Sequence, residues 1–202
     1  MKSFIVITSI NEPTEAVEKF SRLSDFRLIV IGDKKTPRDW HFSNVIFLGV
    51  DSPEAAKFSL SSAVPYNHYC RKMIGYLHAV KLGADTIVDT DDDNIPKTDW
   101  SFPVFDGHFD HVADQAGFIN IYKHFTSQHI WPRGLPLRLI NDKRPLEKTS
   151  SQRQARVGVW QALADGDPDV DAIYRLTSDV PCAFNNQQPI VLGKGTVTPF
   201  NS

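Results

Sequence analysis

Cysteine, net charge and long hydrophobic runs are all scarce in this sequence. The two cysteines, Cys70 and Cys182, lie far apart and in no Cys-x-x-Cys or Cys/His spacing, which argues against a disulfide scaffold or a structural zinc site and favours a reducing compartment. The net charge of -2 at pH 7 provides no overall basic field for nucleic acid. Apolar runs such as residues 4–7 and 45–48 are too short to span a membrane, and polar residues follow the first run where a signal peptide would continue. We therefore expect a soluble and, on these grounds, cytoplasmic protein.

Apolar strand-like runs alternate with helical patterns through the first half of the chain. Hydrophobic residues make up 41% of the 202 residues, which is enough to bury the core of one domain. A helix is expected after Pro13 and another over residues 67–82. Continuous apolar strands that alternate with helices predict an α/β fold with a mostly parallel sheet flanked by helices. The four predicted strands are Ser3–Thr8, Phe26–Ile31, Val45–Val50 and Thr86–Asp89.

The predicted helix over residues 67–82 ends before Gly83, a residue type that commonly stops helices. Arg71 falls on the opposite side of this helix from the apolar residues. The apolar residues with helical spacing, which we expect to form the buried face, are Met73, Ile74, Leu77 and Val80.

The second half of the chain is less regular. Residues 102–109 and 117–122 predict shorter strands of an antiparallel part, and residues 190–200 predict a last short strand or two. Residues 152–163 have helical spacing, and the acidic turn 165–171 follows this predicted helix. A smaller, partly antiparallel region is therefore expected beside the parallel sheet.

An acidic segment directly follows the fourth predicted strand. Residues 89–94 read Asp-Thr-Asp-Asp-Asp-Asn. In open α/β sheets, ligands bind beyond the carboxyl ends of the strands, and carboxylates gathered there repel one another unless a cation compensates them. A divalent metal held by one or two Asp would leave coordination positions for a diphosphate. The alternative is an acidic turn formed with Asn94 and Pro96.

Other motifs explain this segment less well. An EF-hand loop from Asp89 would need Gly at the sixth position and Glu at the twelfth, where the sequence has Asn94 and Trp100. A haloacid-dehalogenase-like phosphatase usually carries its acidic pair at the first strand, so that interpretation is a weak rival. No Walker P-loop, GxSxG elbow or HExxH motif occurs. The Asp-x-Asp motif of a GT-A glycosyltransferase remains.

Several further motifs, in the same order along the chain, resemble the glycosyltransferase domain of the STELLO family. A looser similarity links Arg133-Gly134 and Asp169–Ala172 to the reversibly glycosylated polypeptides, which include UDP-arabinopyranose mutases. The resemblance implies one GT-A domain over residues 1–202, with a nucleotide-sugar-binding half at 1–94 and an acceptor-side half at 95–202, in a chain that can be part of a longer protein. The motifs are Ile7–Thr14, Gly32–Pro37, Pro65–Asn67, Arg71–Lys72, Gly75–Tyr76, Asp91–Asn94, Trp131–Gly134, Asp165–Ala172 and Pro199–Ser202.

The resemblance also implies a UDP-linked sugar as ligand, with its nucleoside at the end of the first strand. Arg71, with Lys72 as a substitute, would bind the diphosphate. The alternatives are a helix cap for the first-strand residues, an ordinary turn for Asp33 and a solvated helix face for Arg71 and Lys72. For the metal, Mn²⁺ or Mg²⁺, the expected ligands are Asp91 and Asp93. The expected donor-binding residues are Thr8, Asn11, Glu12, Asp33, Arg71, Lys72, Asp91 and Asp92.

Four residues of the second half are candidates for the acceptor side. Arg133 lies in a loop where a guanidinium suits a phosphate or an acceptor, and Trp131 is expected to line the same cleft. Asp169 and Asp171 are the candidate catalytic residues, as a general base in an inverting enzyme or for orientation and charge stabilisation in a retaining one. The alternative is a solvated turn.

Together these features predict a metal-dependent glycosyltransferase that moves a sugar from a nucleotide-sugar donor to a hydroxyl group of a glycan or glycoprotein acceptor. A sugar-nucleotide-binding or assembly module without transfer activity and a sugar-nucleotide mutase are the alternatives. Neither nucleic acid nor a membrane is an expected partner of this chain, although the resemblance leaves open a Golgi-type placement for a longer protein.

Overall fold

The computed structural model describes residues 1–101, 103–112, 117–166, 168–178, 181–185 and 188–199. The chain divides into two compact units, Met1–Trp100 and Ser101–Ser202, called here the first and second unit. Asp167 of the predicted acidic turn and residues 200–202 of the last motif lie outside the described residues. Within the described ranges, no helix is both long enough and apolar enough to cross a membrane.

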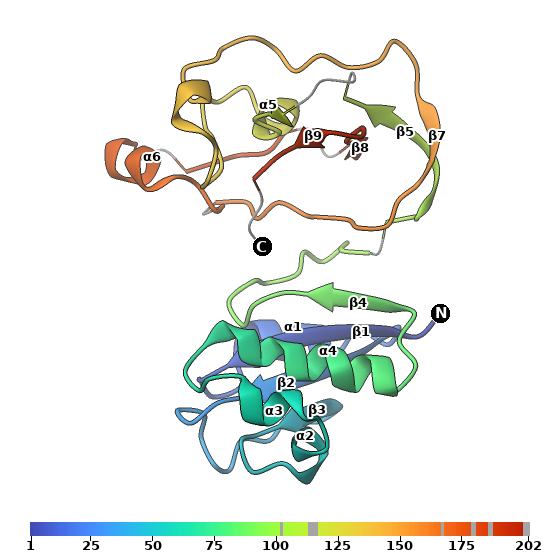
Figure 1. Ribbon diagram of the computed structural model, residues 1–202, viewed down its shortest axis with the longest axis vertical. Helices are drawn as coiled ribbons and strands as arrows, with labels where there is room; N and C mark the ends of the chain where they lie inside the picture. The colour runs from blue at the N-terminus through green and yellow to red at the C-terminus, as the bar shows by residue number, and fades with distance from the viewer. Residues whose placement is uncertain (102, 113–116, 167, 179–180, 186–187, 200–202) are drawn as a thin grey trace. The chain divides into compact units, whose positions relative to one another are not determined.

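The first unit is built on a four-stranded sheet with the order β3-β2-β1-β4 and only parallel pairings (Figure 1). All four strands occur where the apolar runs predict them, and the β1 and β2 side chains between Phe4 and Ile31 form a buried core. The α/β prediction with a mostly parallel sheet is confirmed. The strands are β1 (Ser3–Ser9), β2 (Phe26–Gly32), β3 (Val45–Leu48) and β4 (Thr86–Asp89).

Helices cover both faces of this sheet, because successive strand residues point to opposite sides. Phe4 and Val6 pack in one cluster with α4, which lies in front of the strands in Figure 1, whereas Ile5 and Ile7 pack in another with α1. Thr14 caps α1 by accepting a hydrogen bond from Val17 N. The helices are α1 (Glu15–Ser21), α2 (Pro53–Ala56), α3 (Leu60–Ala63), η1 (Tyr69–Arg71) and α4 (Lys72–Lys81).

The predicted buried face of α4 is confirmed at Ile74 and wrong at the other three positions. Met73 and Val80 are 49% and 61% exposed, and Leu77 is also exposed. The helix instead turns its small and polar side toward the sheet, because Gly75 allows a close approach: a Cβ at Gly75 would lie 2.5 Å from Val6 Cγ1. The residues that α4 buries are Lys72, Ile74, Gly75, His78 and Ala79.

The second unit contains a small mixed sheet with the order β7-β5-β8 and a separate β6-β9 pair. β7 is antiparallel to β5, and β8 is parallel to it, which agrees with the expected smaller, partly antiparallel region. Its core includes Val112, Ile130 and Trp131. The elements are β5 (Asp106–His111), β6 (Gly117–Phe118), α5 (Tyr122–Phe125), η2 (Leu137–Leu139), β7 (Arg153–Arg156), α6 (Ala172–Thr177), β8 (Ile190–Val191) and β9 (Thr196–Val197).

The predicted helix over residues 152–163 is also wrong. Residues 153–156 form the edge strand β7 instead, which pairs with residues 106–109 of β5. Trp160 contributes an indole N–H to Val104 O at 3.0 Å and packs edge-on against Phe109. Long-range pairing and aromatic packing therefore override the local helical spacing.

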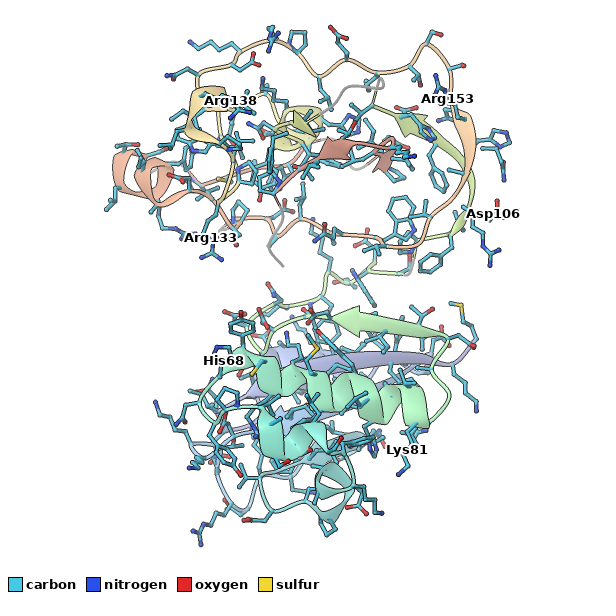
Figure 2. The ribbon with its side chains drawn as sticks, viewed as in Figure 1. His68, Lys81, Asp106, Arg133, Arg138 and Arg153 are labelled. Atoms are coloured by element: carbon cyan, nitrogen blue, oxygen red, sulfur yellow. The ribbon has the colours of Figure 1, made fainter. Side chains whose placement is uncertain are left out.

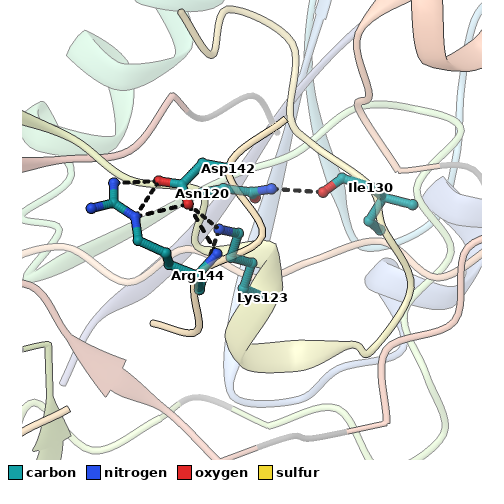
Figure 3. Close-up of polar contacts among 5 residues, drawn as sticks. All are labelled: Asn120, Lys123, Ile130, Asp142 and Arg144. Carbon is teal, nitrogen blue, oxygen red and sulfur yellow. Dashed lines mark hydrogen bonds and ion pairs between the residues drawn. The ribbon is translucent and has the colours of Figure 1, made fainter. Parts of the chain in front are cut away.

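Residues 133–156 contain seven Arg or Lys side chains and only two acidic ones, and part of this positive charge is neutralised within the second unit. The Asp142 carboxylate accepts hydrogen bonds from the Arg144 guanidinium at 2.6–3.1 Å, and Lys123 Nζ lies 3.8 Å away (Figure 3). The hydrogen bonds from Arg144 hold the pKa of Asp142 well below its ordinary value. Elsewhere in this unit, the Asn120 side chain donates to Ile130 O at 2.7 Å and fixes the loop that precedes Trp131 (Figure 3).

Candidate functional site

A cavity of about 390 Å³ lies at the carboxyl ends of β1 and β2 in the first unit. This is the edge at which parallel α/β sheets bind ligands. His68, labelled in Figure 2 at the start of the α4 segment, is one of its lining residues. Five of the predicted donor-binding residues also line it: Thr8, Asn11, Asp33, Arg71 and Asp92.

The turn after β2 holds the Asp33 side chain in place. Thr36 Oγ1 donates to Ser9 O at 2.7 Å and accepts from Asp33 N at 2.7 Å, which ties the ends of β1 and β2 together. The Asp33 carboxylate accepts from the backbone N of Lys34 and of Asn67, both at 2.7 Å. Asp33 is therefore partly committed to holding the cavity wall, while it also lines the cavity.

Arg71 is a buried cation at the cavity. Its side chain is 4% exposed, Nε lies 3.5 Å from Gly32 O and 3.7 Å from Asp33 Oδ2, and the Tyr66 ring covers the guanidinium at 4.6 Å. The interpretation of Arg71 as part of a solvated helix face is wrong. No hydrogen-bond acceptor for its buried Nη1 occurs among the described residues. A buried donor without an acceptor is costly, so this group is suited to an anionic ligand in the cavity.

Asp92 connects the acidic segment to the turn after β1. Its Oδ2 accepts a short hydrogen bond from Ser9 Oγ and another from Asn11 Nδ2 at 3.0 Å, and its backbone O accepts from Thr14 Oγ1 at 2.6 Å. These contacts bring Asp92 into the cavity wall together with Asn11. Glu12 is exposed and is not one of the lining residues.

Lys72 points toward the acidic segment. Its Nζ donates to Asp89 Oδ1 and Asp91 Oδ1 at 2.7 Å each and to Thr90 O at 3.0 Å. Burial lowers the pKa of Lys72, but hydrogen bonds to Asp89 and Asp91 outweigh burial, and the pKa lies above its ordinary value. Burial also raises the pKa of Tyr76, one helical turn further along α4, with interaction with Asp89 as the second cause.

The acidic segment offers few ligands to a metal ion. No group of three His, Cys, Asp or Glu side chains that could hold a metal occurs in the part of the chain that the structure describes. Asp91 is 44% exposed and uses one oxygen for Lys72, and Asp93 is exposed. Such a donor set fits a metal that is bound by one or two carboxylates together with diphosphate oxygens, as is common for Mg²⁺.

The second unit brings the four acceptor-side candidates together. Arg133 Nη2 pairs with Asp169 Oδ2 at 2.7 Å, Arg133 N donates to Asp169 O, and Asp171 N donates to Trp131 O. The Asp171 side chain caps α6 by accepting from Ile173 N at 2.8 Å. Asp171 thus has a structural task, whereas the Asp169 side chain, 19% exposed, is held by Arg133.

Burial positions two aromatic side chains beside this group. The Tyr122 hydroxyl donates to Asp169 O at 3.1 Å, and burial raises the pKa of Tyr122 to about 12, so the hydroxyl stays protonated. Trp131 is buried and packs edge-on against Tyr174. Its indole N–H has no acceptor among the described residues.

Two known proteins are similar to this chain over its whole length. Over 228 aligned residues, which include the whole chain, the sequence is 28% identical to the probable glycosyltransferase STELLO2 and 27% identical to the probable glycosyltransferase STELLO1, both from Arabidopsis thaliana. The resemblance to the STELLO proteins is confirmed. The chain spans only 29% and 28% of the lengths of these two STELLO proteins. No family model matches it.

Sequence reasoning missed several residues that shape the cavity. Ser9 and Thr36 join the strand ends, and Tyr66 covers Arg71. Asn67, whose backbone N binds Asp33, has a φ of 54°. Asn67 lies between α3 and η1, and Asn is a residue type that tolerates such a left-handed turn, so this signal was present in the sequence.

Proposed function

We propose that the chain binds a UDP-linked sugar in the first-unit cavity and transfers the sugar to a hydroxyl group of a glycan or glycoprotein acceptor. The observation that carries the proposal is the buried Arg71 guanidinium at the ligand-binding edge of the sheet, whose Nη1 finds no acceptor among the residues that the structure describes. The similarity to two probable glycosyltransferases supports the class of reaction. The uridine base is inferred from the STELLO resemblance.

In the proposed complex, Arg71 binds the diphosphate, because its guanidinium matches phosphate oxygens and is already desolvated. The nucleoside lies near Thr8 and Asn11, and Asp33 accepts hydrogen bonds from ribose or base. Asp92 fixes Asn11 and so the shape of the nucleoside-binding wall. Each of these side chains lines the same cavity.

A divalent ion, Mn²⁺ or Mg²⁺, would be held by Asp93 and the second oxygen of Asp91. When bound, the metal supplies positive charge that stabilises the departing diphosphate. Arg71 adds a fixed charge of the same sign. Asp91 and Asp93 also orient the donor relative to Arg71, since both follow β4 at the carboxyl edge.

On the acceptor side, Asp169 is the candidate base or charge-stabilising group. The Arg133 ion pair keeps the Asp169 carboxylate oriented, and the Tyr122 hydroxyl holds its backbone. A carboxylate held in this way accepts a proton from a hydroxyl acceptor in an inverting transfer, or stabilises positive charge in a retaining one. Asp171 supports the same loop through its cap of α6.

The test is calorimetry of UDP, GDP and ADP binding with Mn²⁺ and with EDTA. We expect UDP to bind most tightly and to depend on the metal, with loss of metal dependence in Asp93→Asn but not in the exposed control Asp99→Asn. A panel of UDP-sugars then separates the activities. Transfer or donor hydrolysis supports a glycosyltransferase, ring interconversion a mutase, and binding alone a nucleotide-sugar-binding module. Equal UDP affinity with EDTA and with Mn²⁺ would contradict the metal role.

A further inference from the structure

Lys72 reaches from α4 to the acidic segment that follows β4. The three N–H bonds of its ammonium group match three acceptors, namely the Asp89 and Asp91 carboxylates and Thr90 O, at 2.7, 2.7 and 3.0 Å. Its side chain is 11% exposed. To donate a hydrogen bond to a diphosphate, Lys72 would have to give up one of these three bonds. Lys72 is therefore a poor substitute for the neighbouring Arg71 as a diphosphate ligand.

We propose that Lys72 is a positioning residue that takes the place of a metal cation in the ligand-free protein, holding Asp91 ready while weakening the binding of a divalent ion on its own. The inference rests on the proposed function because it assumes that a metal binds beside Asp91. It goes further by assigning Lys72 to the acidic segment rather than to the donor.

Charge explains why such a residue is needed. Four carboxylates, those of Asp89, Asp91, Asp92 and Asp93, lie within five successive positions. Ser9 and Asn11 stabilise Asp92 through neutral donors. Lys72 is the cation that the structure places against two of the others.

The same charge opposes a free divalent ion. An ammonium group that already compensates Asp89 and Asp91 reduces the attraction of the segment for Mn²⁺, since like charges repel at short range. In the described part of the acidic segment, the ligands left for a metal are the second oxygen of Asp91 and the exposed Asp93 carboxylate. A bound diphosphate supplies both further oxygen ligands and negative charge, so firm metal binding is expected only with the nucleotide present.

The experiment measures Mn²⁺ binding without nucleotide, from the loss of the free Mn²⁺ signal in electron paramagnetic resonance, for full-length chains. Lys72→Gln removes the charge and keeps an amide donor, Lys72→Met keeps the length of the side chain, and Lys72→Arg keeps the charge. Lys81→Gln, at the other end of α4 (Figure 2), is the control. We expect the two uncharged variants to bind Mn²⁺ about tenfold more tightly or better than the natural chain, with Lys72→Arg and Lys81→Gln unchanged.

Thermal unfolding provides a second readout. We expect Lys72→Gln to lose stability in EDTA and to regain it with millimolar Mn²⁺, because the metal replaces the missing charge and stabilises the folded state that binds it. A residue with only a packing role would give a loss that Mn²⁺ leaves unchanged. If the uncharged variants fold only in Mn²⁺, that recovery supports the proposal, and failure to refold in Mn²⁺ as well as EDTA overturns it.

A folded Lys72→Gln that binds Mn²⁺ no more tightly than the natural chain also overturns the proposal. This outcome is separate from a failure of the proposed function. If UDP does not bind the natural chain, the donor assignment falls, while the comparison of Mn²⁺ affinities among the Lys72 variants still decides the role of Lys72.

Discussion

Replacement of Arg71 by Met tests the donor site most directly. The change removes the guanidinium and keeps an aliphatic side chain of similar reach beside Tyr66. In the natural chain, the guanidinium is desolvated, and no described residue provides an acceptor for its Nη1. The free-energy cost of desolvating this cation is therefore already included in folding. Most of the interaction energy between Arg71 and a diphosphate then contributes to the binding affinity.

The expected loss of UDP affinity in Arg71→Met follows from the hydrogen bonds that Arg71 can donate to the diphosphate. A hydrogen bond to a charged group contributes about 1.5–3 kcal/mol, so loss of one such bond to the diphosphate weakens UDP binding by about 10- to 150-fold. Because uridine lacks the diphosphate, the affinity for uridine should change by less than about threefold. Asp33 keeps its two backbone donors at 2.7 Å, so the unfolding free energy should fall by only about 1–3 kcal/mol.

Calorimetry of UDP, UMP and uridine checks this prediction, with thermal unfolding as a test of folding. Lys34→Met is a matched control, since Lys34 Nζ lies 4.2 Å from the same Tyr66 ring but does not line the cavity. An Arg71→Met protein that binds UDP as tightly as the natural chain would refute the reasoning. So would an equal loss of affinity for UDP and uridine.

Three further predictions concern packing, pH and the acceptor side. Gly75→Ala should lower the unfolding free energy in urea by about 1–3 kcal/mol, because its Cβ would lie 2.5 Å from Val6 Cγ1; no loss would show that α4 can shift. Burial lowers the pKa of His78, so the unfolded state binds more protons and stability should fall as pH drops through about 6.5; thermal unfolding of His78→Gln should show a shallower pH dependence. Asp169→Asn should leave UDP affinity within about 1 kcal/mol and lower the transfer rate by about 100-fold, and Arg133→Met should lower the transfer rate by less. If Asp169→Asn transfers sugar at the wild-type rate, the role of Asp169 is structural only.

The sheet of the first unit could be predicted from the sequence because its strands are buried on both faces. A run such as residues 26–31 is continuously apolar, and this pattern has few structural alternatives. The α4 face could not be predicted in the same way. Its buried side is determined by the close approach at Gly75 and by the ion pairs of Arg71 and Lys72 with Asp33 and Asp89 at the strand ends. Hydrophobic spacing reveals neither the close approach nor the ion pairs.

The site residues were predictable to different degrees for the same reason. The ends of parallel strands meet at one edge, so Thr8, Asp33 and Asp92 could be expected together. The commitment of Lys72 to Asp89 joins residues 17 positions apart and depends on the three-dimensional structure. The capping role of Asp171 is local, because its side chain binds the backbone N of Ile173, and an Asp before a helix is a signal that the sequence carries. In the second unit, the paired strands are short and their partners lie far apart in the chain, so local spacing misassigned residues 152–163.

The position of β4 next to β1 has a consequence for the order in which the cavity forms during synthesis. β1 and β2 can pair early in translation, but β4 is the last strand of its sheet to be made and joins next to the first. Only after β4 docks can Asp92 reach Ser9 and Asn11. Domains fold as units from the N-terminus during synthesis, so a nascent chain becomes able to bind the proposed donor only when the first unit is essentially complete. Binding of the proposed donor would then selectively stabilise chains in which this last strand is in place.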